Sequence, residues 1–382
     1  MPRSPLICIL SMVMACVSGA QAQLLQTDAA HAVILDHETG QVLFEKDADT
    51  AMVPASMTKV MTAHLVFDRI RSGEIALDDR LTVSERAWRE GGWATGGSTM
   101  GLGIGETPTV EELLRGVIIV SGNDACIVLA EGLSGSEELF ASEMTALAQE
   151  MGLSSARFQN ASGLNAEGHR ISALDMARLA SATIREFPEF YPVYAEDSFT
   201  WNGITQSNRN PILGTMSGVD GLKTGHLSVS GYGLVASAER DGVRRIIVIN
   251  GLESMAARAR EAERLMRLAF SAFDTRRVER SGRRLGELDV WMGQARRVGV
   301  TLEAPIEITA HKRAFANGTT HIVYDGPLEA PIEAGEHIAD LQIELADGSS
   351  VTAPLVAMES VEKLDFIGRS IEGLALMLDP GT

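Results

Sequence analysis

The chain has 382 residues, of which 45% are hydrophobic and 22% charged, and its formal net charge is −18 at pH 7. This composition is typical of a globular protein and excludes disordered and collagen-like chains. No basic patch stands out, which argues against nucleic-acid binding, and the length suggests two or three domains.

A short apolar segment begins the chain. Arg3 precedes an almost wholly apolar run at 6–17, and residues 20–22 read Ala-Gln-Ala, which fits a small-x-small cleavage site. The run is shorter than the about 20 residues that a transmembrane helix needs. We therefore expect residues 1–22 to be a signal peptide and the mature chain to begin near Gln23. A buried N-terminal helix and lipoprotein processing at Cys16 are the alternatives.

Only one cysteine, Cys126, lies beyond the expected signal peptide, because Cys8 and Cys16 fall inside it. The mature chain would then form no intramolecular disulfide. An exported protein without disulfides fits the bacterial periplasm or the cell surface. We interpret Cys126 as a small buried apolar residue, with a reactive thiol as the alternative.

The first elements predicted are a hairpin and a helix. Residues 30–35 and 41–44 are strand-like runs with turn residues at 38–40 between them. A helix is expected from Ser56 to Ile70, because apolar residues recur there at helical spacing. Residues 91–105 are rich in Gly, Ser and Thr and predict a long loop, and such loops in compact domains are often functional.

The middle of the chain is helical, and strands return after it. Helices are predicted at 109–119, 124–132, 136–151 and 172–186. Apolar runs at 232–238 and 243–249, joined across Asp241-Gly242, predict a second hairpin, and an amphipathic helix follows at 255–273. Strands at both ends with helices between them predict an α/β (α+β) domain over 23–275, with a mixed sheet flanked by helices.

The texture of the sequence changes from about Gly282 onward. Strand-like stretches at 298–302, 321–324 and 339–345 alternate with Gly, Pro and Asp turns. They predict a small all-β sandwich domain over 282–355. Residues 356–382 carry apolar residues at helical spacing and predict a C-terminal amphipathic helix. That helix could lie on a membrane surface or pack against its own β domain.

The first candidate catalytic motif is Ser56-Met57-Thr58-Lys59 at the start of a predicted helix. Positions i and i+3 share one helix face, so Lys59 can reach the hydroxyl of Ser56. A serine hydroxyl becomes a nucleophile when a base takes its proton. A lysine that burial and a nearby positive charge keep neutral can be that base. Alone, the motif is equally typical of a surface helix with a solvated lysine.

The second motif is Ser121-Gly122-Asn123, between an apolar run and the helix predicted to begin at Asp124. Both polar side chains can face one cavity. Ser121 could relay a proton to a leaving group, and the amide of Asn123 could hold both substrate and Lys59. Alone, the motif is also an ordinary helix N-cap.

The third motif is Lys223-Thr224-Gly225, followed by His226. The lysine supplies positive charge, the threonine offers a hydroxyl to a carboxylate, and the glycine lets a substrate lie close to a strand edge. Alone, the motif is typical of an exposed strand end. The three motifs together, in this order, indicate a serine acyl-transfer enzyme.

Three stretches make the sequence resemble the low-molecular-mass penicillin-binding proteins of the D-alanyl-D-alanine carboxypeptidase type, a family of serine peptidases. They read Pro-Ala-Ser-Met-Thr-Lys at 54–59, Ser-Gly-Asn-Asp-Ala-Cys at 121–126 and Val-Asp-Gly-Leu-Lys-Thr-Gly-His at 219–226. Asn208-Arg209-Asn210 and Arg260-Glu261-Ala262-Glu263 support the resemblance. It covers residues 28–275 firmly and the rest more loosely, and it implies a β-lactamase/transpeptidase-like fold.

The resemblance implies a role for each motif. Ser56 would attack the carbonyl between two D-alanines and form an acyl-enzyme, with Lys59 as general base. Ser121 and Asn123 would complete the proton network. Backbone N–H groups of Ser56 and His226 would form the oxyanion hole.

The resemblance also implies how the substrate is held. Lys223 and Thr224, with Arg209, would receive the terminal carboxylate beside Gly225, and Arg260 would be a structural arginine behind the site. The substrate would be a peptidoglycan stem peptide ending in D-Ala-D-Ala, and β-lactam antibiotics would acylate Ser56. The protein would act in the periplasm, with the C-terminal helix at the outer face of the cytoplasmic membrane. No cofactor, metal or nucleic acid is implied.

One stretch departs from the family pattern, and three other functions use related features. Ser162-Gly163-Leu164-Asn165 stands where the family often shows His-Gly-Leu-Asp, which concerns loop packing more than the reaction class. A β-lactamase is the nearest alternative, but the Glu-x-x-Leu-Asn pattern of class A enzymes is not found between Asn123 and Lys223. An endopeptidase would use the same motifs. Intact Ser56 and both motif lysines argue against a catalytically silent cell-wall-binding protein.

Overall fold

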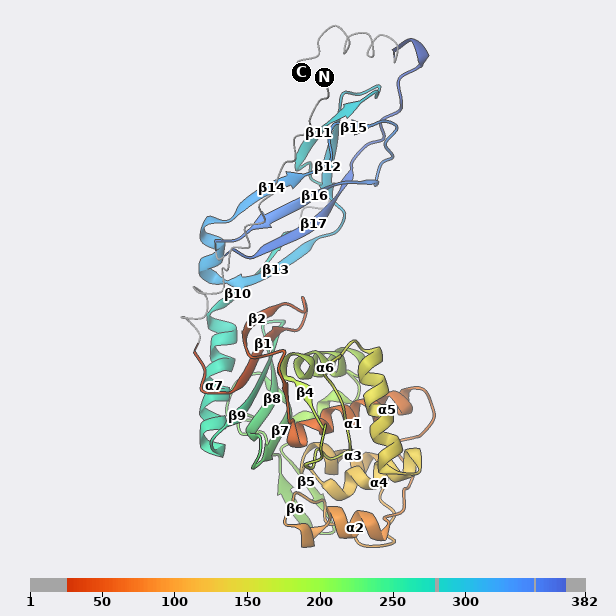
Figure 1. Ribbon diagram of the computed structural model, residues 1–382, viewed down its shortest axis with the longest axis vertical. Coiled ribbons are helices and arrows are strands. Elements are labelled where there is room, and N and C mark those ends of the chain that lie inside the picture. Colours follow the sequence, from red (N-terminus) through yellow and green to blue (C-terminus); the bar gives the residue numbers. More distant parts are fainter. Residues whose placement is uncertain (1–25, 279–281, 347, 369–382) are drawn as a thin grey trace, which may run out of the picture. The chain divides into compact units, whose positions relative to one another are not determined.

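The computed structural model describes residues 26–278, 282–346 and 348–368. Residues 27–276, with 309–311, form one compact unit, and residues 277–308 and 312–368 belong to another. Figure 1 labels the strands and helices of both. The predicted signal peptide lies outside the described residues.

The first unit is built on one sheet. Its strands are β1 (His31–Asp36), β2 (Val42–Lys46), β7 (Val219–Leu227), β8 (Gly231–Arg240) and β9 (Val243–Leu252). Their order is β2-β1-β9-β8-β7, and both predicted hairpins are present as β1–β2 and β8–β9. All four neighbouring pairs are antiparallel, so the sheet is antiparallel where a mixed one was expected. The reason is that β7, β8 and β9 follow one another as hairpins and β1 runs opposite to β9.

Helices occupy the middle of the first unit, as predicted. They are α1 (Lys59–Arg71), α2 (Glu85–Gly91), α3 (Val110–Ile118), α4 (Asn123–Ser134), α5 (Glu137–Glu150), α6 (Ala173–Glu186) and α7 (Met255–Ser271). The helix predicted from Ser56 begins as a 3₁₀ turn, η1 (Ala55–Thr58), that leads into α1. The helix α2 was not predicted. The predicted loop follows it and is irregular apart from η2 (Trp93–Thr95).

The shorter elements of this unit complete its connections. They are β3 (Ala51–Met52), β4 (Ile171–Ser172), β5 (Ser198–Trp201), β6 (Ile204–Ser207) and η3 (Tyr191–Ala195). The strands β3 and β4 pair with each other, as do β5 and β6. None of these short strands pairs with β7, which is the last strand of the large sheet and forms one of its edges.

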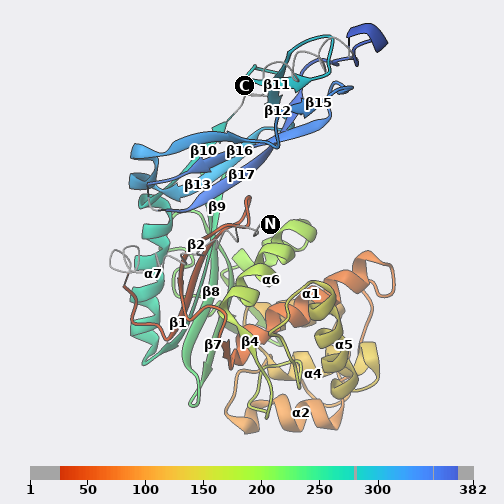
Figure 2. The same ribbon diagram turned by 45° about the horizontal axis from the view of Figure 1, so that its top comes forward.

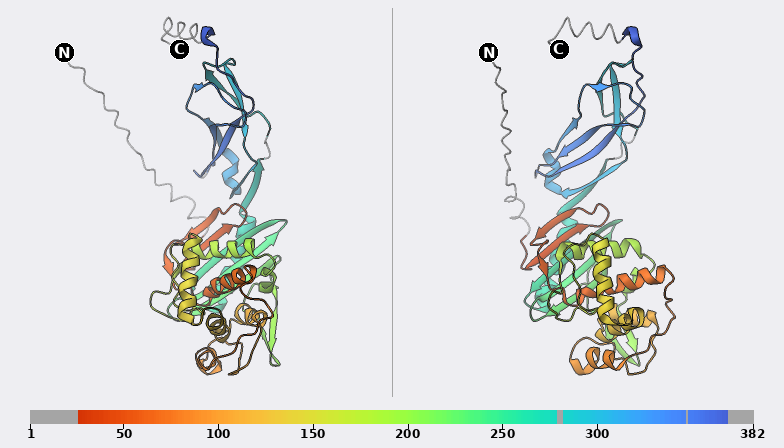
Figure 3. Two further views of the ribbon diagram at one scale, coloured as in Figure 1. Left: turned by 90° about the vertical axis from the view of Figure 1, so that its right-hand side faces the viewer. Right: turned by 45° about the vertical axis from the view of Figure 1, so that its right-hand side comes forward.

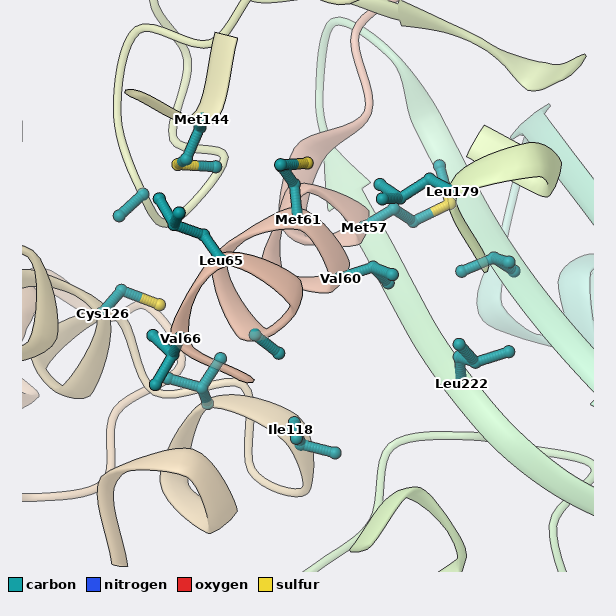
Figure 4. Close-up of a cluster of buried hydrophobic side chains, with 14 of the residues drawn as sticks. Met57, Val60, Met61, Leu65, Val66, Ile118, Cys126, Met144, Leu179 and Leu222 are labelled. Carbon is teal, nitrogen blue, oxygen red and sulfur yellow. The ribbon is translucent and has the colours of Figure 1, made fainter. Parts of the chain in front are cut away.

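The helix α1 lies in the core between the sheet and the other helices. In Figures 2 and 3, α7 covers one face of the sheet, and α1 and α6 lie on the other. Side chains of α1 are surrounded by residues of α3, α4, α5, α6 and β7, among them Ile118, Cys126, Met144, Leu179 and Leu222 (Figure 4). Cys126 is fully buried, which confirms its interpretation as an apolar core residue. The helix α1 is therefore fixed by packing against four helices and one strand.

The second unit is all-β, as predicted. Six strands form one sheet in the order β14-β16-β17-β12-β11-β15. They are β11 (Gly286–Trp291), β12 (Arg297–Leu302), β14 (Thr319–Val323), β15 (Leu328–Glu329), β16 (His337–Glu344) and β17 (Ser350–Ala357). The strand β10 (Phe273–Val278) pairs with β13 (Ile306–His311), and the residues of both strands are divided between the two units. The 3₁₀ turn η4 (Lys312–Asn317) follows β13. The three predicted stretches correspond to β12, β14 and β16.

The terminal helix begins later than predicted. Val356 and Ala357 still belong to β17, and Val361 forms a bridge with Ile332 in the core of the β unit. The spacing of apolar residues predicted Val361 as part of the helix, but its side chain packs in the core of the β unit. Helical residues begin at Phe366, and the predicted helix from 369 onward lies outside the described residues. None of the described helices is long and apolar enough to span a membrane.

Candidate active site

Ser56 and Lys59 meet where η1 passes into α1. The Nζ atom of Lys59 lies 3.0 Å from Ser56 Oγ, 2.8 Å from Asn123 Oδ1 and 2.6 Å from the Ser162 carbonyl oxygen. The Asn123 and Ser162 oxygens can only accept hydrogen bonds. A neutral amine has two hydrogens and one lone pair, so donating to these two oxygens leaves the lone pair for the hydroxyl of Ser56. This is the geometry of a base that takes the serine proton.

Burial lowers the pKa of both lysines of the site. Desolvation lowers the pKa of the fully buried Lys59, although the negative charge of Asp124 acts in the opposite direction. Burial lowers the pKa of Lys223 even further below its ordinary value, and the charge of Lys59 adds to the effect. Burial therefore favours the neutral amine at Lys59, and burial together with the charge of Lys59 favours the neutral amine at Lys223.

An unusual backbone conformation at Ser121 positions the second motif. Ser121 has a φ of 65°, in the left-handed region that serine rarely occupies, and its side chain is buried. Ala55, next to Ser56, has a φ of 49°. Such outliers cluster at functional sites because the surrounding structure must hold them in place. The turn at Ser121 directs the chain into α4, whose first residue, Asn123, reaches Lys59.

Asp124 attaches the predicted loop to this turn. Its buried carboxylate accepts hydrogen bonds from Thr99 Oγ1 at 2.6 Å and from the backbone N–H groups of residues 100–102 at 2.8, 2.8 and 3.0 Å. Gly97 lies so close to Asn123 that a Cβ there would stand 3.0 Å from Nδ2. The loop therefore borders the site. Asp124 was predicted only as the start of a helix, and the signal for its further role was an acidic residue within a buried segment.

The third motif lies on β7, against η1. A Cβ on Gly225 would stand 2.5 Å from the carbonyl oxygen of Pro54, so this glycine lets β7 approach the turn that carries Ser56. We had predicted Gly225 only for the close approach of a substrate. Thr224 is buried next to it, and the exposed ring of His226 stacks on Tyr232, with ring centroids 3.9 Å apart.

Of the two arginines predicted near the site, one lies elsewhere than expected. Arg209 is exposed and near enough to lower the pKa of Lys223. Arg260 is exposed and does not lie behind the site. Arg258 takes that place: it is buried, its guanidinium lies 5.8 Å from the centre of the Tyr232 ring, and its Nε has no hydrogen-bond partner among the described residues. Positions i and i+2 of a helix point in different directions, which separates Arg258 from Arg260.

The stretch that departs from the family pattern contributes its backbone to the site. The carbonyl of Ser162 accepts from Lys59. Gly163 has a φ of 80°, and a Cβ there would stand 1.9 Å from the carbonyl oxygen of Ala55. Because these contacts use main-chain atoms and a missing side chain, a serine at position 162 preserves them.

Comparisons with known proteins agree with this geometry. Residues 17–254 match the family model described as D-alanyl-D-alanine carboxypeptidase, and residues 273–363 match the C-terminal domain of penicillin-binding protein 5. D-alanyl-D-alanine carboxypeptidase DacA of Escherichia coli (strain K12) is 33% identical over 356 residues, which are 92% of this chain and 88% of that protein.

Solved structures show the same similarity. Penicillin-binding protein 5 from Haemophilus influenzae has 34% identity and a TM-score of 0.76, covering 89% of this chain and 99% of that one. Penicillin-binding protein D2 from Listeria monocytogenes, in its ampicillin-bound form, has 30% identity and a TM-score of 0.56, covering 65% of this chain and 99% of that one. The chain thus belongs to the D-alanyl-D-alanine carboxypeptidase family of serine peptidases.

Proposed function

We propose that the protein is a serine-type D-Ala-D-Ala carboxypeptidase that removes the terminal D-alanine of peptidoglycan stem peptides and binds penicillin covalently at Ser56. The observation that carries the proposal is the position of Lys59, whose amine joins Ser56 Oγ to two acceptor oxygens. A buried lysine with this set of partners serves as a base for the serine.

Acylation begins when Ser56 Oγ attacks the carbonyl carbon of the penultimate D-alanine and its proton passes to Lys59. The oxyanion forms beside the backbone N–H groups of Ser56 and His226. The C–N bond then breaks, and the Ser121 hydroxyl gives its proton to the leaving amine of the terminal D-alanine. Ser121 takes the proton held by Lys59 in exchange, which returns Lys59 to the neutral amine. Water hydrolyses the ester, again with Lys59 as base, and restores the free serine.

Positive charge gathers where the substrate carboxylate would lie. Lys223 and Thr224 lie on β7, and the charges of the exposed Arg209 and the buried Arg258 are near enough to lower the pKa of Lys223. Burial of Lys223 and Arg258 as cations without a carboxylate is costly. A bound carboxylate would favour their charged forms and recover part of that cost.

Arg258 and Arg260 form a matched pair for a test. Arg258→Gln is expected to raise KM for a peptide ending in D-Ala-D-Ala about tenfold, because about 1.4 kcal/mol of carboxylate binding is lost. Arg260→Gln removes the same charge from an exposed position of the same helix and is expected to leave KM unchanged. Steady-state kinetics of D-alanine release measures both. Equal KM values for the two variants would contradict the assignment of Arg258.

We also propose the location and domain boundaries. The signal peptide, residues 1–22, directs export to the periplasm, and the peptidase domain spans 23–275, with the β domain at 282–355. Attachment to the outer face of the cytoplasmic membrane through the C-terminal segment is supported by Phe366 and Ile367, which are 77% and 68% exposed.

The test of the function uses the mature protein. It is labelled with a fluorescent penicillin, the labelled peptide is mapped, and free D-alanine is assayed after incubation with a peptide ending in D-Ala-D-Ala. We expect the label on Ser56 and release of one D-alanine per peptide. Label on Ser56 without D-alanine release would favour an endopeptidase, and an unlabelled protein would refute the proposal.

A further inference from the structure

Glu137, in the first turn of α5, is a buried carboxylate that none of the proposed acylation steps uses, and only 6% of the residue is exposed. Its Oε1 accepts a hydrogen bond from the backbone N–H of Ala161, and its Oε2 accepts one from Nη2 of Arg86, both at 3.1 Å. A guanidinium on one oxygen and a backbone N–H on the other suit an ionised carboxylate. Burial raises the pKa of this carboxyl group, and the charges of Glu90 and Glu138 add to this, against the charge of Arg86. Keeping the charge inside the protein therefore has a cost that a surface carboxylate would not have.

The bond from Ala161 connects Glu137 to the turn that faces Lys59. The carbonyl of Ala161 accepts from Thr62 Oγ1 at 2.6 Å, so α1 holds one side of this residue while Glu137 on α5 holds the other. The next carbonyl, that of Ser162, accepts from Lys59 Nζ at 2.6 Å. Thr62 and Lys59 are three positions apart on α1 and therefore share a face of the helix. The attachments of Ala161 thus determine where the Ser162 carbonyl meets the amine of Lys59.

Hydrogen bonds within the turn join residues 160–164 into one body. Asn160 Oδ1 accepts from the N–H of Gly163 at 2.7 Å, and Asn160 Nδ2 donates to the carbonyl of Leu164 at 2.9 Å. A shift at Ala161 would therefore move the whole turn, including the carbonyl of Ser162. A displacement of about 1 Å at a reacting group can lower a rate about 10²-fold, so both attachments of Ala161 bear on acylation.

The charge of Glu137 also reaches Lys59. Burial, the largest influence, lowers the pKa of Lys59, whereas the charges of Asp124 on α4 and Glu137 on α5 raise it. The other titratable groups whose charges act on this amine or respond to it are Cys126, His169 and Lys223. Burial raises the pKa of Cys126 to about 12 and lowers that of His169 to about 4, so both side chains are neutral at pH 7. The two carboxylates are therefore the groups that favour the ammonium form of Lys59.

We propose that Glu137 is a positioning residue for acylation. It holds the turn at 160–164 so that the Ser162 carbonyl faces Lys59, and its carboxylate stabilises the ammonium group that Lys59 becomes when it takes the proton of Ser56. Glu137 itself exchanges no proton and touches no substrate. The inference rests on the proposed function in one respect, because it assigns Glu137 to the step in which Lys59 acts as the base.

Glu137→Gln and Glu138→Gln are a matched pair of variants that test the charge. Each removes a carboxylate that Arg86 contacts on the same helix, but the Glu138 side chain is 67% exposed. Lys59 accepts the proton only as a neutral amine, so the rate of penicillin acylation, followed by stopped flow, rises as pH increases through its pKa. Without the charge of Glu137 that pKa falls, and we expect the midpoint of the rise at a lower pH than in the parent. Above the midpoint the rate should be about tenfold lower, because a lysine of lower pKa is a weaker base. Glu138→Gln should keep both the midpoint and the rate of the parent.

Thr62→Val tests the attachment of the turn without changing a charge. It removes the donor to the Ala161 carbonyl and is expected to slow acylation about tenfold, since the bond to Glu137 still holds the other side of Ala161. Thr183→Val is its control. It removes a buried hydroxyl that donates to the Leu179 carbonyl at 2.8 Å, outside the candidate site, and should keep the rate of the parent.

The outcomes separate this inference from the proposed function. Near-UV circular dichroism establishes which variants are folded, and Thr62→Val keeps the positioning role testable even if Glu137→Gln does not fold. A folded Glu137→Gln with the midpoint of the parent, or a folded Thr62→Val with the rate of the parent, would overturn the inference, while labelling of the parent at Ser56 still supports the function. A parent protein that penicillin does not label would overturn both.

Discussion

Lys59→Arg is expected to lower kcat/KM for D-alanine release about 10³-fold, within the range of about 10²–10⁴ for loss of a general base. The guanidinium keeps its proton at any pH at which the protein is folded, so it cannot take the proton of Ser56. It can still donate to Asn123 Oδ1 and the Ser162 carbonyl, which Lys59 Nζ contacts at 2.8 and 2.6 Å. The variant therefore removes the base while it keeps hydrogen-bond donors beside both acceptors.

The pH dependence of acylation gives this prediction a second measurement. Lys59 acts only when neutral, so the rate rises as pH increases through its pKa and is constant above it. Burial lowers that pKa from the ordinary value of 10.5, so the rise should come below pH 10.5. Stopped-flow labelling with penicillin follows the rate, and Lys59→Arg should lack the rise. A rise centred near pH 10.5, or a variant as fast as the parent, would contradict the role of Lys59.

Local sequence patterns predicted most elements of the first unit but not the direction of its strands. Apolar spacing and turn residues located both hairpins and the helices α3 to α7 within a few residues. Whether neighbouring strands run parallel depends on which distant strands meet, and no local pattern contains that information. The helix α2 was missed because it has only seven residues and buries only Ala87 and Gly91, too few for a helical period.

The parts of the candidate site that are formed by side chains could be predicted from the sequence. Ser56 and Lys59 are three positions apart, and Asn123 was expected to reach them although it is 64 residues from Lys59. Ser162, 103 residues away, could not be predicted because it contributes a carbonyl oxygen that any residue would supply. Arg258 was missed for a different reason. Sequence alone does not show which of two arginines on α7 faces the sheet.

Asp124→Asn is expected to lower the free energy of unfolding by about 3 kcal/mol and the rate of penicillin acylation about 10²-fold. Oδ1 accepts from the N–H groups of Met100 and Ala125, and Oδ2 from those of Gly101 and Leu102. Whichever oxygen becomes an amide, two backbone donors lose their acceptor, and each costs about 1–3 kcal/mol. The loop that borders Asn123 then loses its attachment, and a displacement of about 1 Å at a reacting group can cost 10²-fold in rate.

Asp175→Asn is the matched control. Asp175 is also buried and also accepts from a loop, through the N–H of Ser155 at 3.0 Å and its hydroxyl at 2.6 Å, but these partners lie outside the candidate site. Chemical denaturation should show a loss of stability in both variants, whereas penicillin acylation of the folded protein should slow only in Asp124→Asn. Equal acylation rates in the two variants would mean that Asp124 stabilises the fold without positioning the site. The contrast would establish Asp124 as a positioning residue, because it isolates a buried carboxylate that joins the loop to the turn at Ser121.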